Sequence, residues 1–322
     1  MFKKNKVLVT GGAGFIGTNL IIKLLEEGVK IRATIHHKDP VINDCRIEYV
    51  RCDLRLEEDC VRAVKGVDYI FMCAANTSGA KVIASTPLVH LTPNILMNIQ
   101  MLQAAYIEGV EKFLFISTNA VYPLTDFAVK EDNVTNEFYD SYHIVAWMKR
   151  FTEIVCDMYS NRVKEKMKTI VIRPGNLYGP YDKFDWEKSK VIPAIIRRAV
   201  EKHNPFEVWG DGTDLKDFLY IDDFIDGLIL AMKKLDESEP INIASGVSIT
   251  IKDILHKVLR ASNYENANVR YDTSKPAMIP KRMIDISLAK EKIGFEPKIS
   301  LEDGIIRTVD WYIKFYKNKN PE

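Results

Sequence analysis

An apolar run passes into three evenly spaced glycines in the sequence Lys6-Val7-Leu8-Val9-Thr10-Gly11-Gly12-Ala13-Gly14-Phe15-Ile16-Gly17. In this G-x-x-G-x-x-G pattern, Gly11 allows a tight turn, Gly14 lets the backbone approach a phosphate, and Gly17 lets the next helix lie close to the strand. Apolar residues at helical spacing follow the glycines and predict a helix. The unpaired N–H groups at the start of that helix would face a phosphate held by the glycine loop. The stretch therefore predicts a site for the pyrophosphate of a dinucleotide.

The overall composition excludes several broad classes of function. The 322 residues include 45 basic and 44 acidic side chains, and this balance gives no electrostatic preference for nucleic acid or an acidic membrane surface. Hydrophobic residues make up 47% of the chain, but no apolar run approaches the roughly 20 residues that a membrane span needs. Because residues 1–4 lead almost directly into the first predicted strand, no signal peptide is expected and a cytoplasmic location is predicted.

The cysteines and histidines do not have the spacing of a metal site. The five cysteines are odd in number and form no C-x-x-C pair, and the six histidines are scattered along the chain. We therefore expect reduced thiols and no bound metal. The cysteines are Cys45, Cys52, Cys60, Cys73 and Cys156.

Strand-like and helix-like segments alternate through the first half of the chain, which predicts an α/β fold with a doubly wound parallel sheet. A dinucleotide-binding domain is expected over residues 1–174, with 218–245 returning to it. Residues 175–217 and 246–322 are expected to form a smaller C-terminal lobe that binds the substrate. The predicted strands are 6–10, 29–35, 47–51, 69–73, 113–117 and 169–173, and the predicted helices are 15–27, 57–64, 94–108 and 142–159.

Residues at the ends of the predicted strands are the candidates for binding and catalysis, because ligands of open parallel sheets bind beyond the carboxyl ends of the strands. Asp53 follows one strand and could accept from an adenine amine. Ala74 and Ala75 are small enough to let a cofactor lie close. Thr118 follows another strand, although a hydroxyl in this position often only forms a turn.

Seven motifs occur together along nearly the whole chain and give it a family resemblance. They are TGGAGFIG (10–17), CAANTSGA (73–80), FISTNAVYP (115–123), IRPGNLYGPYDKF (172–184), KVIPAIIRR (190–198), VWGDGTDLKDFLYIDD (208–223) and YDTSKPAMIPKRMID (271–285). The chain resembles the extended short-chain dehydrogenases/reductases that act on nucleotide sugars, and within them the GDP-L-fucose synthase group. The resemblance implies a Rossmann fold, a nicotinamide cofactor and a GDP-sugar substrate.

In the family, catalysis uses a serine or threonine, a tyrosine, and a lysine four residues after the tyrosine. The resemblance assigns Thr118 as the hydroxyl residue and Lys149 as the lysine, because Glu153 and Tyr159 follow at the family's spacing. The tyrosine position then holds Val145, so the usual proton-transfer group is absent. In the alternative register Tyr142 substitutes for it, but seven residues before Lys149 it would lie roughly 10 Å away along a helix.

The fucose synthase group also epimerises its substrate with a cysteine and a histidine, and here these positions hold Ala120 and Tyr181. Alanine cannot move a proton, so epimerisation by that route is not expected. Lys216 stands where an arginine is common, and it and Arg282 could instead be plain solubilising charges. The resemblance implies these substrate-binding residues: Thr118, Asn119, Asn176, Tyr181, Val191, Lys216 and Arg282.

The choice of cofactor depends on the end of the second strand, where an acid usually binds the ribose 2′-hydroxyl of NAD. Position 35 is Ile35, and His36, His37 and Lys38 follow it. Neutral histidines would not hold a 2′-phosphate firmly, so NAD is expected, with NADP left open. The resemblance and the strand ends give these cofactor-binding residues: Gly11, Gly14, Phe15, Ile16, Gly17, His36, Asp53, Leu54, Ala74, Ala75, Lys149, Pro174 and Asn176.

The expected reaction is transfer of hydride between the cofactor and C4 of a GDP-linked hexose or heptose, as a 4-dehydrogenase in capsule or lipopolysaccharide sugar synthesis. A GDP-4-keto-sugar reductase and a non-catalytic protein that binds NAD and a nucleotide sugar are the alternatives. The helices 94–108 and 142–159 match those that form a four-helix homodimer interface in the family. Their apolar residues could instead face only the sheet.

Overall fold

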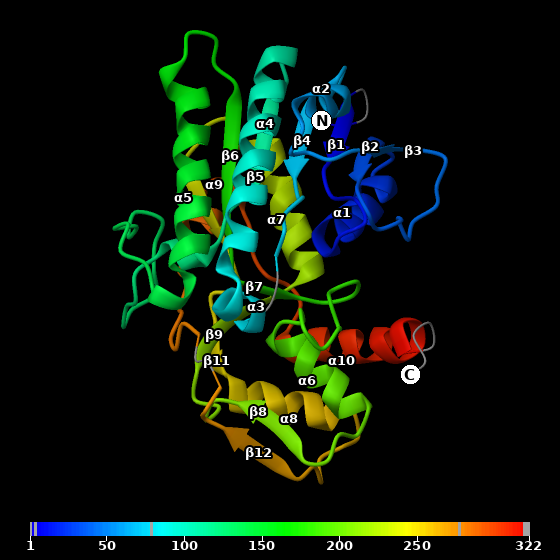
Figure 1. Cartoon of the computed structure of the whole chain (residues 1–322), viewed down its shortest axis with the longest axis vertical. Coiled ribbons are helices and arrows are strands. Elements are labelled where there is room, and N and C mark those ends of the chain that lie inside the picture. The colour runs from blue at the N-terminus through cyan, green and yellow to red at the C-terminus, as the bar shows by residue number, and fades with distance from the viewer. Residues whose placement is uncertain (1, 3–4, 78–79, 276–277, 318–322) are drawn as a thin grey trace.

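The computed structural model describes residues 2, 5–77, 80–275 and 278–317, and so leaves out parts of two quoted motifs, at 78–79 and 276–277. Its centre is a seven-stranded parallel sheet with strand order β10-β6-β5-β4-β1-β2-β3 (Figure 1). This confirms the predicted α/β fold with a doubly wound sheet. The strands are β1 (Lys6–Val9), β2 (Lys30–Ile35), β3 (Ile47–Arg51), β4 (Tyr69–Met72), β5 (Lys112–Ile116), β6 (Lys168–Pro174) and β10 (Pro240–Ile243).

Helices cover both faces of this sheet, and the alternation of side chains along β1 shows how. Val7 and Val9 pack into one core with α1 and α7, while Leu8 packs into another core with α2, α4 and α5. Successive side chains of a strand point to opposite faces, so a strand buried on both sides is apolar throughout. The helices are α1 (Phe15–Glu26), α2 (Glu57–Val64), α4 (Thr92–Glu108), α5 (His143–Asp157) and α7 (Ile221–Lys234).

The C-terminal half contributes a second group of elements, drawn below the sheet in Figure 1. A three-stranded sheet has the order β11-β9-β7, and β8 pairs with β12. The helix α9 (Ser287–Ile293) instead packs against α7 and β10 of the main sheet. The predicted division of the chain into domains stays a prediction. The remaining elements are β7 (Asn176–Tyr178), β8 (Phe206–Trp209), β9 (Leu215–Tyr220), β11 (Ser248–Thr250), β12 (Val269–Asp272), α3 (Ala80–Ser85), α6 (Val191–Val200), α8 (Ile251–Ala261) and α10 (Leu301–Trp311).

The start of α5 differs from the sequence-based expectation. The helix begins at His143, whereas Tyr142 closes the short 3₁₀ turn Asp140–Tyr142 with φ −111° and ψ 3°. The helix also ends earlier than expected, because a π-helical turn replaces it over Met158–Arg162. None of the described helices is long and apolar enough to cross a membrane.

Candidate active site

The glycine loop joins β1 to α1 and has no room for side chains. Gly11 has φ +67°, and a Cβ on it would lie 2.9 Å from the Cα of Ala74. A Cβ on Gly17 would lie 2.3 Å from the carbonyl oxygen of Gly11, and one on Gly14 would lie 3.1 Å from the same oxygen. The loop is therefore a bare backbone cradle at the start of α1, which fits the pyrophosphate of a dinucleotide.

Replacing Gly17 by alanine should remove cofactor binding, because the new Cβ would collide with the backbone of Gly11 and push α1 away from the loop. We expect NAD affinity to fall at least about 100-fold, which is about 2.7 kcal/mol, in a calorimetric titration. Gly28→Ala is the control for an added methyl group away from the loop: Gly28, unlike Gly17, has a positive φ, so this variant carries backbone strain, but nothing lies within 4 Å of its added Cβ. Tight NAD binding by the Gly17→Ala protein would show that the pyrophosphate lies elsewhere.

The predicted adenosine-binding residues lie at the ends of β2 and β3. The Asp53 carboxylate accepts from Arg55 Nη2 at 2.5 Å, and this bond lowers the pKa of Asp53 to about 2. His36 Nε2 lies 3.7 Å from the same carboxylate, while Ile35 and Leu54 are buried. The structure thus brings His36, Asp53 and Leu54 together, and position 35 offers no acid to a ribose.

The end of β4 is held in place by hydrogen bonds to neighbouring elements. The backbone N–H of Ala74 donates to Thr10 Oγ1 at 2.9 Å, which fixes Ala74 and Ala75 beside the glycine loop. The Asn76 N–H donates to Asn94 Oδ1 at 2.8 Å, and Asn94 Nδ2 donates back to the Asn76 oxygen at 3.0 Å. The loop after β4 is therefore bonded to the start of α4.

The Lys149 ammonium bonds to the end of β5, two residues before Thr118. The buried Lys149 ammonium donates to the carbonyl oxygen of Ile116 at 2.7 Å and lies 4.6 Å from the ring centroid of Phe115. Burial lowers the pKa of Lys149 to about 8. Thr118 is half-buried, and its Oγ1 accepts from the Ala120 N–H at 3.2 Å, which caps the short turn Asn119–Val121. The turn-forming role foreseen for Thr118 is present, and the hydroxyl can still donate.

Neither Val145, at the position of the missing tyrosine, nor the nearby Tyr142 can take over the proton transfer of that tyrosine. Val145 is the third residue of α5, in its first turn, and is half-buried. Tyr142 precedes α5 and packs against a cluster that contains Ala120, Val121 and Tyr122. Burial raises the pKa of Tyr142 to about 12, so this phenol is a poor proton acceptor near neutral pH.

A buried polar network beneath the site was not predicted from the sequence. Glu153, one turn after Lys149, forms a two-point ion pair with Arg173 of β6, with distances of 3.0 and 2.8 Å. Ser117 Oγ donates to Glu153 at 2.5 Å, and Arg173 also donates to the Tyr122 hydroxyl at 3.1 Å. The network joins α5 to β6 and to the end of β5, through Ser117, the residue before Thr118. The only sign of this network in the sequence is that Glu153 follows Lys149 at the spacing found in the family.

Four predicted substrate residues follow one another along the chain: Asn119 lies after β5, Asn176 in β7, Tyr181 in the loop after β7, and Val191 at the start of α6. Asn119 Nδ2 donates to the Pro174 oxygen at 2.8 Å, and Asn176 Nδ2 donates to the Asp217 oxygen at 2.9 Å. Tyr181 has φ +67°, a strained conformation for a bulky residue, and packs edge-on against Trp311. Val191, the first residue of α6, is exposed.

The remaining two predicted substrate residues, Lys216 and Arg282, are buried, so the alternative that they are solubilising surface charges is wrong. Lys216 Nζ donates to the backbone oxygen of Ile279, and burial lowers the pKa of Lys216. Arg282 donates to the backbone oxygen of Tyr122 at 2.9 Å, and burial lowers the pKa of Arg282 to about 10. Its other terminal nitrogen donates to the backbone oxygen of Pro123 at 2.8 Å, and its buried Nε has no hydrogen-bond partner among the described residues.

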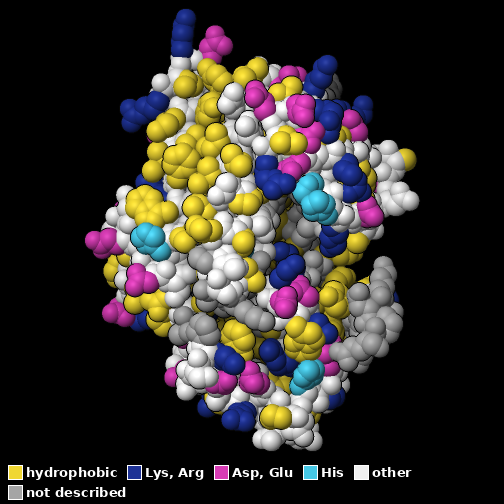
Figure 2. All heavy atoms as spheres, viewed as in Figure 1, with side chains coloured by type: hydrophobic (Ala, Val, Ile, Leu, Met, Phe, Trp, Pro, Cys, Tyr) yellow, Lys and Arg dark blue, Asp and Glu magenta, His cyan; other side chains and the backbone are white. Residues whose placement is uncertain are grey.

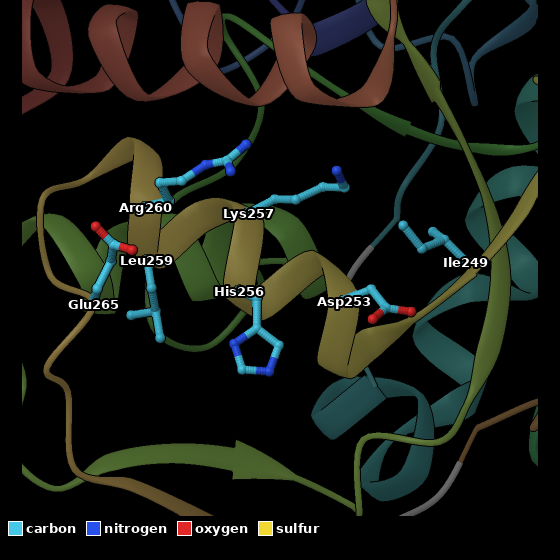
Figure 3. A pocket seen from close by; sticks show the side chains of 7 residues that line it. All are labelled: Ile249, Asp253, His256, Lys257, Leu259, Arg260 and Glu265. Carbon is cyan, nitrogen blue, oxygen red and sulfur yellow. The ribbon is translucent and has the colours of Figure 1, made fainter.

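A hollow of about 580 Å³ lies along α8 of the C-terminal lobe, and its lining residue Ile249 pairs with Lys216 of the neighbouring strand (Figure 3). Lys257 and Arg260 point toward α10, where both pair with Glu302, while His256 points the other way. None of its lining residues belongs to the predicted site. In the part of the chain that the structure describes, no group of three or more histidine, cysteine or acidic side chains could hold a metal.

Comparison with known proteins gives the family. The model of the NAD dependent epimerase/dehydratase family matches residues 7–244. The GDP-L-fucose synthase of Sinorhizobium fredii is 30% identical over 96% of this chain and 95% of its own length. The GDP-mannose 3,5-epimerase 1 of Oryza sativa subsp. japonica is also 30% identical, over 96% of this chain and 82% of its own length.

Solved structures agree with the fold and the cofactor. The UDP-glucose 4-epimerase of Thermotoga maritima, solved with UDP-glucose, has a TM-score of 0.87 and 27% identity, over 97% of this chain and 99% of its own. The Thermus thermophilus UDP-glucose 4-epimerase, solved with NAD, has a TM-score of 0.85 and 25% identity, over 96% of this chain and 99% of its own. The chain therefore belongs to the NAD dependent epimerase/dehydratase family, and it is an enzyme of the extended short-chain type whose cofactor is NAD.

Proposed function

We propose that this enzyme transfers hydride between NAD and C4 of a GDP-linked hexose or heptose, as a 4-dehydrogenase in the synthesis of capsule or lipopolysaccharide sugars. The observation that carries the proposal is that the Lys149 ammonium bonds to Ile116, the last residue of β5 and two residues before Thr118, while the glycine cradle follows β1 in the same sheet. Two of the relatives are named for GDP-sugars, which supports a GDP-linked substrate.

Each residue of this set has a task that its position suits. The glycine loop would bind the pyrophosphate, and Lys149 would hold the nicotinamide ribose through its ammonium. Thr118 would donate or accept a hydrogen bond at the 4-hydroxyl of the sugar. Bound NAD supplies the hydride acceptor. Arg282, the residue that the family resemblance assigns to this task, would bind the diphosphate of the nucleotide.

Epimerisation is not part of the proposal, because the two residues that would move the protons are absent. Ala120 is buried and has no ionisable group. Tyr181 stands at the histidine position and packs against Trp311, and a phenol is a poor proton carrier near neutral pH. The chemistry left to the site is hydride transfer together with one proton transfer.

Incubation with NAD and a panel of nucleotide sugars tests this proposal. GDP-mannose and a GDP-heptose should give a 4-keto product by NMR, together with NADH absorbance at 340 nm, whereas UDP-glucose should give neither. If no GDP-sugar produces a keto sugar or reduces NAD, the proposal fails. Oxidation of NADH by a GDP-4-keto sugar alone would favour the reductase alternative, and binding without any hydride transfer would favour the non-catalytic one.

We also propose that the enzyme is a cytoplasmic homodimer. All five cysteines are free thiols, as expected in a reducing compartment. The helices α4 and α5 pack side by side, with Asn98 Nδ2 donating to Thr152 Oγ1 at 3.1 Å. Figure 2 shows hydrophobic side chains gathered over these helices, and a second copy would cover them. The exposed apolar residues on the two helices are Leu96, Ile107, Trp147 and Phe151, with Met158 directly after α5.

Replacing Phe151 by aspartate should convert the dimer into a monomer, because it would bury a charge in the middle of this apolar patch. The molar mass from light scattering should fall by half. Phe315→Asp is the matched control, since Phe315 is 44% exposed against 43% for Phe151 but follows α10 on the other lobe. A monomeric wild-type protein, or a dimeric Phe151→Asp protein, would contradict this interface.

A further inference from the structure

We propose that Asn19 is a positioning residue that couples the binding of NAD to the binding of the nucleotide sugar. Its side chain holds residues 179–184, a segment that we call the strap, against helix α1 of the cofactor site. The inference rests on the proposed function, because it assigns Tyr181 of the strap to the sugar. Asn19 lies outside the seven motifs that carry the family resemblance.

The side chain of Asn19 joins two segments that are 161 residues apart in the sequence. Its Nδ2 donates to the carbonyl oxygen of Pro180 at 3.0 Å and to that of Phe15, one turn earlier in α1, at 2.9 Å. An amide nitrogen carries two hydrogens, so both bonds form at the same time. Asn19 is 9% exposed, and hydrogen bonds are stronger where water is largely excluded. Asn19 is therefore a fixed link between α1 and the strap.

A second contact joins the strap to the cofactor side of the sheet. Lys183 Nζ donates at 2.6 Å to the backbone oxygen of Thr77, in the loop that follows β4. Asn19 follows the glycine loop after β1, and β1 and β4 are paired parallel strands. Both contacts therefore join the strap to segments that follow adjacent strands, at the carboxyl edge of the sheet where a dinucleotide binds.

The strap is also anchored to the C-terminal lobe. Tyr181 packs edge-on against Trp311, with 5.1 Å between the ring centroids. Phe184 is buried, and its ring centroid lies 4.7 Å from that of Tyr312. The backbone oxygen of Phe184 accepts from Arg197 of α6 at 2.9 Å. The strap thus connects the cofactor site with the lobe that is proposed to bind the sugar.

The backbone of the strap has an unfavourable conformation at Tyr181. Its φ of +67° lies in the left-handed region, which bulky residues rarely adopt. Such a conformation persists only where surrounding contacts fix it, and it is common at ligand-binding sites. Tyr181 lies between Pro180 and Lys183, the two strap residues that contact the cofactor side. These contacts therefore set the position of the residue that the family resemblance assigns to the sugar.

Coupling between the two ligands follows from this arrangement. Bonds from the N–H groups of α1 to the pyrophosphate make the first turn of the helix more rigid. Asn19 is bonded to Phe15, the first residue of that turn, so its amide becomes more rigid with it. A nucleotide sugar that binds next meets a strap that is already ordered and loses less conformational freedom. NAD should therefore raise the affinity for the sugar and, by linkage, the sugar should raise the affinity for NAD by the same factor.

Calorimetric titrations measure this coupling directly. GDP-mannose and, in a separate series, UDP-glucose are titrated into the enzyme freed of cofactor and into the enzyme saturated with NADH, a combination in which no hydride can be transferred. We expect NADH to raise the affinity of the wild type for the sugar at least about 5-fold. In Asn19→Leu, which has a similar size and no donor, the factor should fall below about twofold. Equal affinities with and without NADH in the wild type, or full coupling in Asn19→Leu, would overturn the proposal.

Two lysine variants test the second contact of the strap in the same titrations. Lys183→Met removes the bond to Thr77, and its coupling should fall toward that of Asn19→Leu. Lys188→Met is the matched control and should keep the wild-type coupling. Lys188 is an exposed lysine of the same connection between β7 and α6, and its backbone N–H donates to Asp185 at 2.7 Å, a bond that the substitution leaves in place. Equal coupling in the two lysine variants would overturn the role of the strap.

Hydrogen exchange tests the strap without any sugar. In the wild type, NAD should slow exchange of the backbone amides of residues 181–184 at least about 5-fold, together with those of α1. In Asn19→Leu the protection of α1 should remain and that of the strap should be lost. Protection of α1 alone in the wild type, or equal protection of the strap in Asn19→Leu, would overturn the assignment.

The two proposals fail separately in these experiments. Coupling with UDP-glucose and not with GDP-mannose would support the role of Asn19 and refute the GDP-linked substrate. Binding of GDP-mannose that is independent of NADH would leave the GDP-linked substrate standing and refute the role of Asn19.

Discussion

Lys149→Met should lower kcat at least about 100-fold while leaving the protein folded. The ammonium of Lys149 bonds to Ile116 at the end of β5, two residues before Thr118, where it is proposed to hold the nicotinamide ribose. Loss of this anchor misplaces the reacting atoms, and a displacement of about 1 Å can slow a reaction about 100-fold. We expect kcat to fall at least that far with a GDP-sugar and NAD, whereas a protein that only binds both would lose some NAD affinity and no chemistry.

The stability of the Lys149→Met protein follows from the lowered pKa. In the folded protein the pKa of Lys149 is about 8, against an ordinary value of 10.5. The charged amine is therefore disfavoured by folding below pH 8, and this penalty disappears as the pH rises toward 10.5. At pH 7 the methionine variant avoids the penalty, so its unfolding midpoint in urea should be no lower than that of the wild type.

Lys112→Met is the matched control for this experiment. Lys112 is also a buried lysine, but its Nζ donates to the backbone oxygens of Met232 and Leu235 at 3.1 and 2.9 Å and pairs with Asp236. This variant should lose stability and keep its kcat. If Lys149→Met turned over normally, Lys149 would not lie at the reaction centre.

Arg173→Met should destabilise the protein by about 3–5 kcal/mol, because it leaves the buried Glu153 carboxylate without its cation. Both members of the pair are only 1% exposed at the side chain. The loss should appear as a lower urea midpoint with an unchanged slope. The activity of the enzyme should also fall, because Glu153 accepts a hydrogen bond from Ser117, the residue before Thr118.

Two further variants separate the buried pair from its surface neighbour. Arg150 also contacts Glu153, at 3.0 Å, but its side chain is 25% exposed, so Arg150→Met should lose only about 0–1 kcal/mol. The double variant Glu153→Gln with Arg173→Met should regain part of the loss, since no unpaired charge remains in the core. Equal effects of Arg150→Met and Arg173→Met would contradict the special role of the buried pair.

The fold was predictable because its signals are local. The glycine spacing, the apolar strands and the helical periodicity lie within short windows, and the sheet has the parallel strands that they predict. Thr118 and Lys149 were found through family motifs and lie at the same strand end. The start of α5 was predicted one residue too early, because Tyr142 fits the helical pattern but has a non-helical backbone.

The remaining features depend on contacts between distant parts of the chain. Arg173 and Glu153 are 20 residues apart on a strand and a helix, and no pattern in the sequence pairs them. Charged residues are rarely buried, so the burial of Lys216 and Arg282 contradicts an expectation from composition alone.

Transfer of a labelled hydrogen from C4 of the sugar tests the central claim most directly. A GDP-hexose and a GDP-heptose, each carrying deuterium at C4, would be mixed in turn with the enzyme and one equivalent of NAD, and the cofactor then analysed by mass spectrometry. The account predicts singly deuterated NADH with at least one of the two sugars, and no exchange of the C3 or C5 hydrogens with solvent. Unlabelled cofactor with both sugars, or solvent exchange at C3 and C5 in its place, would contradict it.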